Sequence, residues 1–379
     1  MDFVKESEKS MIELIEKLVN IDSGSNNKEG IDRIGKILIK KYLKMGFDYQ
    51  RIINDTLGDH LVIQHKDAAE TDILLLAHMD TVFPDGTTTA RPFKIIDNRA
   101  YGPGVIDMKS SLVTLLYSVK RLFHIGDESY KNISILLTSD EEIGSPTSKQ
   151  LIRKISETKK YALVMEPARE DGSIVSSRRG GGCYQLTVKG RAAHAGVSPE
   201  EGVSAIEELA YKIVELEELN SLDEGISISV GIVEGGEAVN VIPDKAEASI
   251  DIRISSIEQG KRLAKKIEEI CSQPNVEGAE IILEGGLGRQ PMELTQKNLE
   301  LVEVVKEVGR SIGLELKDTH TGGGSDASFP SEVGVATIDG LGPIGGELHS
   351  EDEYLEVSSL TERCYLLSKL ITRLTKGNY

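Results

Sequence analysis

Several apolar runs in this chain end abruptly at a histidine or a carboxylate. The first runs from Ile73 to Ala77 and continues directly into His78 and Asp80. An uninterrupted apolar run of this length indicates a strand buried on both faces, as in a parallel sheet. Ligands of open α/β sheets bind at the carboxyl ends of such strands. The run therefore predicts a mostly parallel sheet with a polar site at one edge.

The same arrangement recurs at three later positions, where an apolar run precedes carboxylates or a histidine: 133–137 before Glu141 and Glu142, 162–165 before Glu166, and 335–338 before His349. A Gly-Pro-Gly turn places Asp107 between the first two runs. Oxygen and nitrogen donors on several rigid elements are what a divalent metal needs. Carboxylates that gather without a cation repel one another. The joint pattern therefore predicts a metal site.

The remaining patterns divide the chain into two domains. Helices alternate with apolar strands up to about residue 178, and helices return after residue 291, which predicts an α/β domain with helices on the faces of its sheet. Between these parts the strand and helix patterns follow the order β-α-β-β-α-β, the split βαβ sandwich. We therefore expect one domain made of residues 1–178 and 291–379, and an inserted α+β domain of residues 179–290.

Charge and cysteine content limit the class of protein. The net charge is −18, whereas a nucleic-acid surface needs clustered Lys and Arg, so nucleic acid is not expected as a partner. Cys183, Cys271 and Cys364 are widely spaced, which indicates free thiols in a reducing compartment. The N-terminal segment lacks a signal-peptide core, and no apolar stretch is long enough to cross a membrane. We expect a cytoplasmic protein without a membrane partner.

The motif set resembles that of the di-zinc aminoacylase/carboxypeptidase family, and within it the bacterial glutamate carboxypeptidase and tripeptidase-like branch. The resemblance rests on five segments in the expected order: His78-Met79-Asp80, Gly102 to Lys109, Ser139 to Ser145, Glu166-Pro167 and Leu348-His349-Ser350. It covers essentially the whole chain. The inserted domain resembles the ferredoxin-like lid or dimerisation domain of that family, so the resemblance implies a homodimer formed through the insert.

The resemblance also implies a role for each residue of the metal site. Asp107 would bridge two zinc ions, with His78 and Glu166 completing one site. Glu142 and His349 would complete the other. Cobalt or manganese are the alternatives to zinc.

Three further residues would act around the metals. By resemblance, Asp80 orients His78 through its second ring nitrogen, and Glu141 is the general base. Adjacent residues that leave a strand point in different directions, so Glu142 can bind metal while Glu141 faces the attacking water. The resemblance implies that His194 polarises the scissile carbonyl, often from the partner subunit.

The substrate carboxylate would be held by other residues of the same resemblance. These are Asn240 and Arg253, with Arg289 near the hinge and possible backbone donors at Gly323 and Gly324. The planar guanidinium of arginine suits this task because it binds a carboxylate through two hydrogen bonds.

One departure from the family pattern bears on specificity. In the glutamate carboxypeptidases, a lysine shortly after the Glu-Pro motif contacts the side-chain carboxylate of the terminal glutamate. Residues 168–174 of this chain contain no lysine, and Arg169 and Arg178 are the nearest substitutes. A preference for C-terminal glutamate therefore does not follow from the sequence.

The sequence thus favours a zinc-dependent exopeptidase that releases an amino acid from a peptide or an N-acyl amino acid. The alternative within the family is a deacylase that removes acetyl or succinyl groups, and pocket size distinguishes the two. A non-catalytic binding protein would be expected to lack a ligand or Glu141, and all of these are present. A di-metal phosphoesterase is disfavoured because no phosphate-cradling loop accompanies the predicted ligands.

Overall fold

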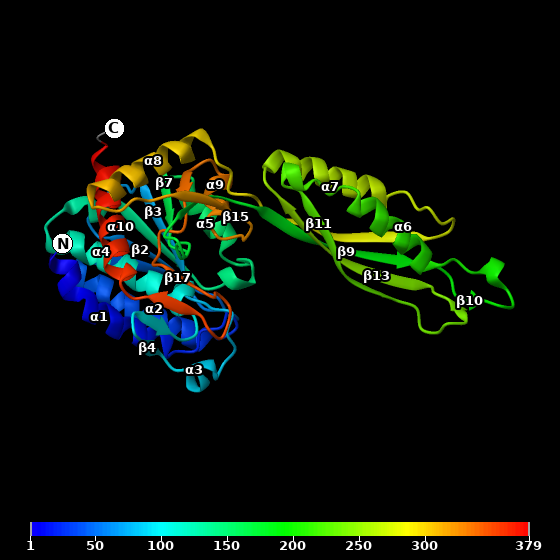
Figure 1. Ribbon diagram of the computed structural model, residues 1–379, viewed down its shortest axis with the longest axis horizontal. Coiled ribbons are helices and arrows are strands. Elements are labelled where there is room, and N and C mark those ends of the chain that lie inside the picture. The colour runs from blue at the N-terminus through cyan, green and yellow to red at the C-terminus, as the bar shows by residue number, and fades with distance from the viewer. Residues whose placement is uncertain (1, 378–379) are drawn as a thin grey trace. The chain divides into compact units, whose positions relative to one another are not determined.

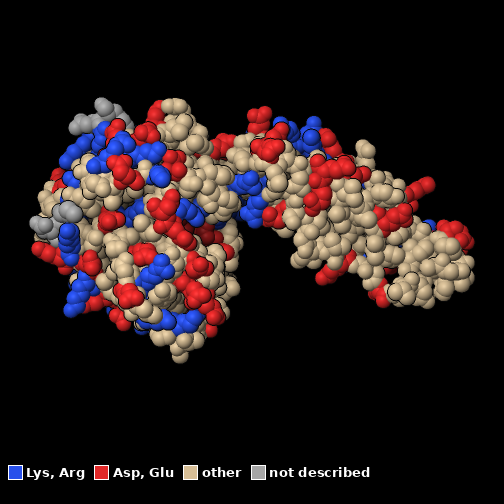
Figure 2. Space-filling view, in the orientation of Figure 1, with Lys and Arg blue, Asp and Glu red and all other residues tan. Residues whose placement is uncertain are grey.

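The computed structural model describes residues 2–377, and these divide into two compact units (Figure 1). Unit 1 holds the described residues of Met1–Ser177, Leu294–Thr321 and Ser325–Tyr379. Unit 2 holds Arg178–Glu293 and Gly322–Gly324. Acidic and basic side chains are interspersed on the visible face of unit 1, whereas most of the visible face of unit 2 carries acidic and uncharged side chains (Figure 2). No helix among the described residues is long and apolar enough to cross a membrane.

Unit 1 contains a six-stranded sheet in the order β1-β2-β6-β3-β7-β16. Its strands are β1 (Phe47–Ile52), β2 (His60–His65), β3 (Ile73–His78), β6 (Ile133–Thr138), β7 (Tyr161–Val164) and β16 (Ala336–Ile338). Strands β6, β3, β7 and β16 are parallel, and β1 and β2 form an antiparallel edge. The predicted mostly parallel sheet is confirmed.

Helices flank this sheet and bury its central strands. They are α1 (Asp2–Val19), α2 (Lys28–Tyr42), α4 (Ser110–His124), α5 (Lys149–Ser156), α8 (Gln296–Ser311), α9 (Ser328–Glu332) and α10 (Ser359–Lys376), with the short α3 (Thr87–Ala90) on a loop. Helices α1, α4 and α10 pack against one another (Figure 1). Every residue of β3 and β6 is buried, which is why both read as continuous apolar runs in the sequence.

Two smaller pairings of short strands accompany the main sheet. One sheet has the order β17-β18-β5-β4 and consists of β4 (Lys94–Ile96), β5 (Arg99–Tyr101), β17 (Gly345–Gly346) and β18 (Tyr354–Glu356). The other pairs β8 (Ile174–Arg178) with β15 (Asp318–Thr321). Strand β5 leads into the turn that carries Asp107, and the loop between β17 and β18 carries His349. The β17-β18-β5-β4 sheet therefore brings the turn that carries Asp107 close to the loop that carries His349.

Unit 2 is an antiparallel sheet with two helices, in the predicted β-α-β-β-α-β order. Its main elements are β9 (Gly180–Lys189), α6 (Ala205–Glu217), β11 (Ser227–Gly235), β13 (Lys245–Ile254), α7 (Ile257–Cys271) and β14 (Glu280–Arg289), with the short pair β10 (Ala193–His194) and β12 (Val241–Ile242). The sheet order is β11-β13-β9-β14. Alternate residues of β9 and β13 are buried together with residues of α6 and α7 in one apolar core.

The chain enters and leaves unit 2 at neighbouring positions. The backbone N–H of Arg178 donates to the carbonyl of Met292 at 3.0 Å, and the N–H of Met292 donates to the carbonyl of Arg178 at 3.1 Å. These reciprocal bonds make one antiparallel bridge at the base of the insert.

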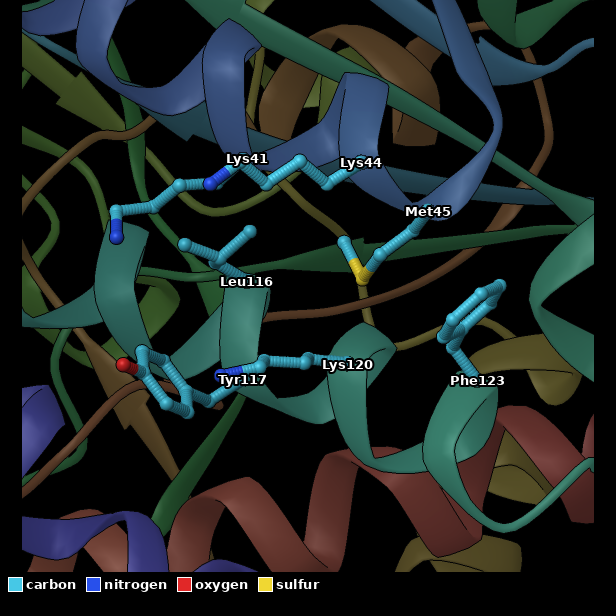
Figure 3. Close-up of a pocket in the computed structure, with 7 residues that line it drawn as sticks. All are labelled: Lys41, Lys44, Met45, Leu116, Tyr117, Lys120 and Phe123. Carbon is cyan, nitrogen blue, oxygen red and sulfur yellow. The ribbon is translucent and has the colours of Figure 1, made fainter.

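A pocket of about 260 Å³ lies between α4 and the segment formed by α2 and η1 (Leu43–Met45) (Figure 3). Lys41, Lys44 and Lys120 surround Met45 and Leu116 there. The pocket shares no lining residue with the predicted metal ligands, so it is a separate feature of unit 1.

Candidate metal centre

The parallel strands bring the predicted ligands to one edge of the unit 1 sheet. His78 is the last residue of β3, Glu141 and Glu142 follow β6 in the short helix η4 (Glu141–Ile143), and Glu166 follows β7. Asp107 lies in the turn η2 (Val105–Lys109), immediately before α4. Because the carboxyl ends of parallel strands share an edge, residues far apart in the sequence meet there.

Asp107 lies between two histidines. Its Oδ1 is 3.1 Å from Nε2 of His78, and its Oδ2 is 3.2 Å from Nε2 of His349. An oxygen of Glu166 lies 3.6 Å from the same nitrogen of His78, and an oxygen of Glu142 lies 3.4 Å from that of His349. The five predicted ligands therefore form two groups of three that share Asp107.

The donor set of these two groups fits a pair of divalent cations. Ligand atoms about 2.1 Å from a tetrahedral metal lie roughly 3.4 Å apart, close to the nitrogen-to-oxygen distances in both groups. Within the described residues, Oε1 of Glu142 is buried without a hydrogen-bond partner. Burying an unpaired carboxylate oxygen is unfavourable. A cation would supply the missing partner, and carboxylate and imidazole ligands suit zinc, cobalt and manganese.

The pKa values of the cluster show how closely its charges are packed. Burial and the charge of Asp107 raise the pKa of Glu142 to about 8 and raise the pKa of Glu166 well above its usual range. Burial alone would raise the pKa of Asp107, but hydrogen bonds from His349 and His78 hold it well below its usual range. The hydrogen bond to Asp107 raises the pKa of His349 to about 9. The cluster thus retains protons in place of the positive charge that metals would bring.

Asp80 supports both the histidine and the carboxylates. Nδ1 of His78 lies 3.0 Å from the backbone carbonyl of Asp80 and 3.4 Å from its carboxylate. The same carboxylate accepts hydrogen bonds from the backbone N–H groups of Glu141 at 3.2 Å and Glu142 at 3.1 Å. The hydroxyl of Ser25 also donates to it at 2.7 Å. One buried carboxylate therefore fixes the position of the imidazole and the start of η4.

Sequence reasoning missed two residues of this site. Ser25 supports Asp80, and Glu353 accepts hydrogen bonds from the turn that carries Asp107. Neither residue ends an apolar run. The spacing of four residues between His349 and Glu353 was the one available signal, and it matches no pattern of catalytic residues.

The residues predicted to bind substrate lie in unit 2: His194, Asn240, Arg253, Arg289, Gly323 and Gly324. His194 and Asn240 are exposed. Arg253 makes two hydrogen bonds of 2.8 Å to Asp251. Arg178 donates to the carbonyl of Gly323 at 3.0 Å. Within unit 2, the predicted substrate contacts are therefore partly engaged by neighbouring residues.

A cleft of about 480 Å³ opens beside the ligand Glu142 in unit 1. Its walls come mainly from the loops after α1 and β3, including Ser25, Val82 and Phe83, and from Ile143. This volume lies within the usual range of small-molecule sites. The cleft therefore provides room for a substrate next to the ligand groups.

Comparison with known proteins identifies relatives along nearly the whole chain. The chain is 31% identical over 376 residues to carboxypeptidase G2 of Pseudomonas sp. (strain RS-16), covering 97% of this chain and 90% of that protein. It is 28% identical over 354 residues to a succinyl-diaminopimelate desuccinylase of Nitrosospira multiformis, covering 88% and 91%. The crystal structure of aminopeptidase PepT from Bacillus cereus has the same fold, with a TM-score of 0.80, 24% identity and coverage of 97% and 98%.

Two groups of candidate metal ligands that share one carboxylate at the edge of an α/β sheet are typical of metal-dependent hydrolases. Residues 74–373 match the model of peptidase family M20/M25/M40, so the chain belongs to that family. The resemblance seen in the sequence motifs is thereby confirmed. The protein is a hydrolase of a metallopeptidase family.

Proposed function

We propose that the protein is a di-metal exopeptidase that hydrolyses the amide bond beside a free carboxylate and releases a carboxyl-terminal amino acid from a peptide or an N-acyl amino acid. The observation that carries this proposal is the Asp107 carboxylate, whose two oxygens face His78 and His349 of separate ligand groups. The identity to carboxypeptidase G2 over nearly all of both chains supports the same reaction class.

In the proposed centre, Asp107 would contribute to the binding of both zinc ions, with cobalt or manganese as alternatives. His78 and Glu166 would complete one ligand set, and Glu142 and His349 the other. When bound, such metals lower the pKa of a water molecule and polarise the substrate carbonyl. Metal analysis of the protein as purified from its own cells identifies the ion.

Glu141 is the proposed general base, which takes a proton from the attacking water and returns it to the leaving amine. Its backbone N–H donates to Asp80, which fixes the start of its side chain. His194 is the proposed donor to the carbonyl oxygen as negative charge develops there. Its Nδ1 accepts a hydrogen bond from the backbone of Gly196 at 3.1 Å, which favours the neutral tautomer that carries the donor proton on Nε2.

The proposed contacts to the substrate carboxylate are Asn240, Arg253 and Arg289, with backbone donors at Gly323 and Gly324. Arg253 would exchange Asp251 for the substrate. An exposed ion pair of this kind is worth about 0–1 kcal/mol, so the exchange is inexpensive. A Cβ at position 324 would lie 3.1 Å from Cδ of Arg289, so Gly324 and the side chain of Arg289 are neighbours within unit 2.

We also propose that the protein forms a homodimer through unit 2. Unit 2 exposes several large apolar side chains, among them Val197, Val214, Leu222, Ile232 and Val239. Ile232 lies on β11, an edge strand of the unit 2 sheet, and an exposed apolar edge strand can pair with a second copy. Sedimentation equilibrium tests the proposal, and a monomeric variant that keeps full activity would contradict a role of His194 in the partner's site.

The cysteines support the proposed cytoplasmic location. Cys183, Cys271 and Cys364 are all free thiols, and free thiols persist in reducing compartments. Fractionation of the source cells with marker enzymes tests this location.

Product analysis by mass spectrometry tests the proposed reaction. Zinc-loaded wild-type protein and the Glu141→Ala variant each receive a pool of short peptides, N-acyl dipeptides and N-acetyl amino acids. Loss of carboxyl-terminal residues with the wild-type protein alone is the expected result, and the residues released show whether glutamate is preferred. Equal inactivity of both proteins would contradict the proposal.

The second candidate function is removal of a small acyl group from an N-acyl amino acid. The identity to a succinyl-diaminopimelate desuccinylase favours it. The higher identity to carboxypeptidase G2, 31% against 28%, favours the exopeptidase. Release of these acyl groups in the same assay, with peptides left intact, would identify a deacylase.

A further inference from the structure

Glu353 is a buried carboxylate with no direct part in the proposed reaction. Its exposed fraction is 1%, and it lies in the loop between β17 and β18 that also carries His349. Both of its oxygens face the turn that carries Asp107, about 250 residues earlier in the chain. A buried charge is unfavourable unless it is well hydrogen-bonded, so its partners indicate what it does.

Three backbone N–H groups of the turn donate to this one carboxylate. Those of Ile106 and Asp107 donate to Oε1 at 2.8 and 3.1 Å, and that of Gly104 donates to Oε2 at 3.1 Å. Hydrogen bonds to an ionised acceptor are roughly twice as strong as those between neutral groups. Asp107 departs from helical geometry within this turn, so the turn is not a regular helical one and its N–H groups find acceptors in Glu353.

A buried cation holds the opposite side of the same turn. The ammonium of Lys109 donates to the backbone carbonyls of Ile21 at 2.9 Å and Pro103 at 3.3 Å. Burial raises the pKa of Glu353 to about 7, while the hydrogen bonds from the N–H groups of the turn favour its ionised form. The turn is therefore fixed by an anion on its N–H groups and by a cation on its carbonyl side.

Glu353 connects the turn that carries Asp107 with the loop that carries His349. Asp107 and His349 both belong to the ligand group that Glu142 completes. Strand β18 pairs with β5, and this pairing fixes the bases of the two loops. Glu353 closes the gap between them through its bonds to the turn, while His349 meets Asp107 at 3.2 Å. A shift of either loop would move Asp107 or His349 relative to the other two ligands of this group.

We propose that Glu353 is a positioning residue that sets the Asp107 carboxylate between the two ligand groups, and that it thereby controls the affinity for both metals. This inference rests on the di-metal centre of the proposed function. It concerns a residue outside both ligand groups, so it can be tested without substrate.

The test is a calorimetric titration of metal-free protein with zinc alone. The proteins compared are the wild type, Glu353→Gln, Glu353→Ala and the matched control Glu356→Gln. Glu356 lies three residues further along, in β18, where its carboxylate pairs with Arg99 at 2.7 Å and with Asn98 at 3.0 Å. The control therefore makes the same chemical change without altering an acceptor of the turn.

Loss of an outer-shell partner typically weakens metal binding by 10- to 100-fold. We expect about a tenfold loss of zinc affinity for Glu353→Gln, whose neutral oxygen still accepts from Ile106 and Asp107 while its amide group opposes the N–H of Gly104. We expect a loss of about 100-fold for Glu353→Ala, which keeps none of the bonds. Glu356→Gln should bind zinc as the wild type does.

A folded Glu353→Gln protein that binds two zinc ions within about threefold of wild-type affinity would overturn the inference. The unfolding midpoint of each metal-free protein is measured in parallel. A lowered midpoint with unchanged zinc affinity would also overturn it, because the role would then be stability alone. Should Glu353→Ala not fold, the Gln variant decides. Failure of the wild type to bind zinc would instead contradict the proposed function.

Discussion

Glu141 and Glu142 are adjacent in η4, but their carboxylates have different surroundings. The side chain of Glu142 is 5% exposed and lies 3.4 Å from His349, whereas Glu141 belongs to neither ligand group. The backbone N–H groups of both residues donate to Asp80. A substitution at one of the two carboxylates therefore leaves the backbone of the other in place.

The different surroundings of the two carboxylates predict different effects of substitution at Glu141 and Glu142. Glu141→Gln should lower kcat by about 10²- to 10⁴-fold, the usual contribution of a general base, while two zinc ions remain bound. Glu142→Gln should weaken zinc binding instead. Turnover of the peptide identified by product analysis and zinc content per protein measure both effects. Full turnover by Glu141→Gln, or loss of its zinc, would contradict the assignment of the base.

At the residue scale, the sequence predicted those site residues that stand beside an apolar run or in a glycine-rich turn. His78, Glu142 and Glu166 lie together because parallel strands end at one edge, and pairing of β18 with β5 brings Asp107 and His349 to the same place. Ser25 and Glu353 were not predictable in this way, since each acts on a partner that is distant in the sequence and neither follows a strand. The roles of the unit 2 residues stay predictions.

At the scale of elements, β3 is the strand on which the site depends. It is central in the sheet between β6 and β7, and it ends at His78. Its apolar side chains are buried on both faces of the sheet. Their packing fixes the position of His78 along the strand direction relative to the carboxylates that follow β6 and β7.

Truncation within β3 should therefore lower the stability of unit 1. Leu75→Ala, at a fully buried position, should reduce the free energy of unfolding by about 2–5 kcal/mol. Ile53→Ala is the control, because Ile53 is 73% exposed and such surface changes stay within about 0.5 kcal/mol. Urea unfolding followed by circular dichroism measures both. Equal effects would show that β3 does not bear on the stability of the unit.

The elements that the sequence did not predict share a physical reason. Strands β3, β6 and β7 are buried on both faces and read as apolar runs. Strands β4, β5, β17 and β18 have two or three residues each and lack such a run. Two hairpin-like pairs, β4 with β5 and β17 with β18, are joined by the pairing of β18 with β5, more than 240 residues away, and pairing over that distance leaves no local pattern.

At the scale of the whole molecule, the metal-free protein should lose stability as pH rises. Glu142 and His349 have pKa values of about 8 and about 9, above their ordinary values of 4.5 and 6.5. Through these two groups the native protein binds more protons than the unfolded chain between about pH 4.5 and 9, which lowers its free energy of unfolding across that range. The contribution of each of the two groups is complete below its ordinary pKa and is lost as pH passes its raised value. Lys109, whose pKa burial lowers to about 7, opposes this decline above pH 7.

Thermal unfolding of chelator-treated protein from pH 5 to pH 9 measures this decline. Zinc should reduce or reverse it, because metal ligands bind in their deprotonated forms. A midpoint of the metal-free protein that rises with pH between 6 and 9 would contradict the expected sign.

The bridge between Arg178 and Met292 has a consequence for the history of such a chain. Backbones paired in this way are about 5.5 Å apart, a gap that a two-residue hairpin turn can close. The 113 residues between Arg178 and Met292 can therefore be inserted, replaced or deleted as one segment, which makes them a cassette in the evolution of the gene. All five candidate ligands lie outside that cassette, so one ancestral hydrolase could acquire new recognition surfaces without disturbing its metal site.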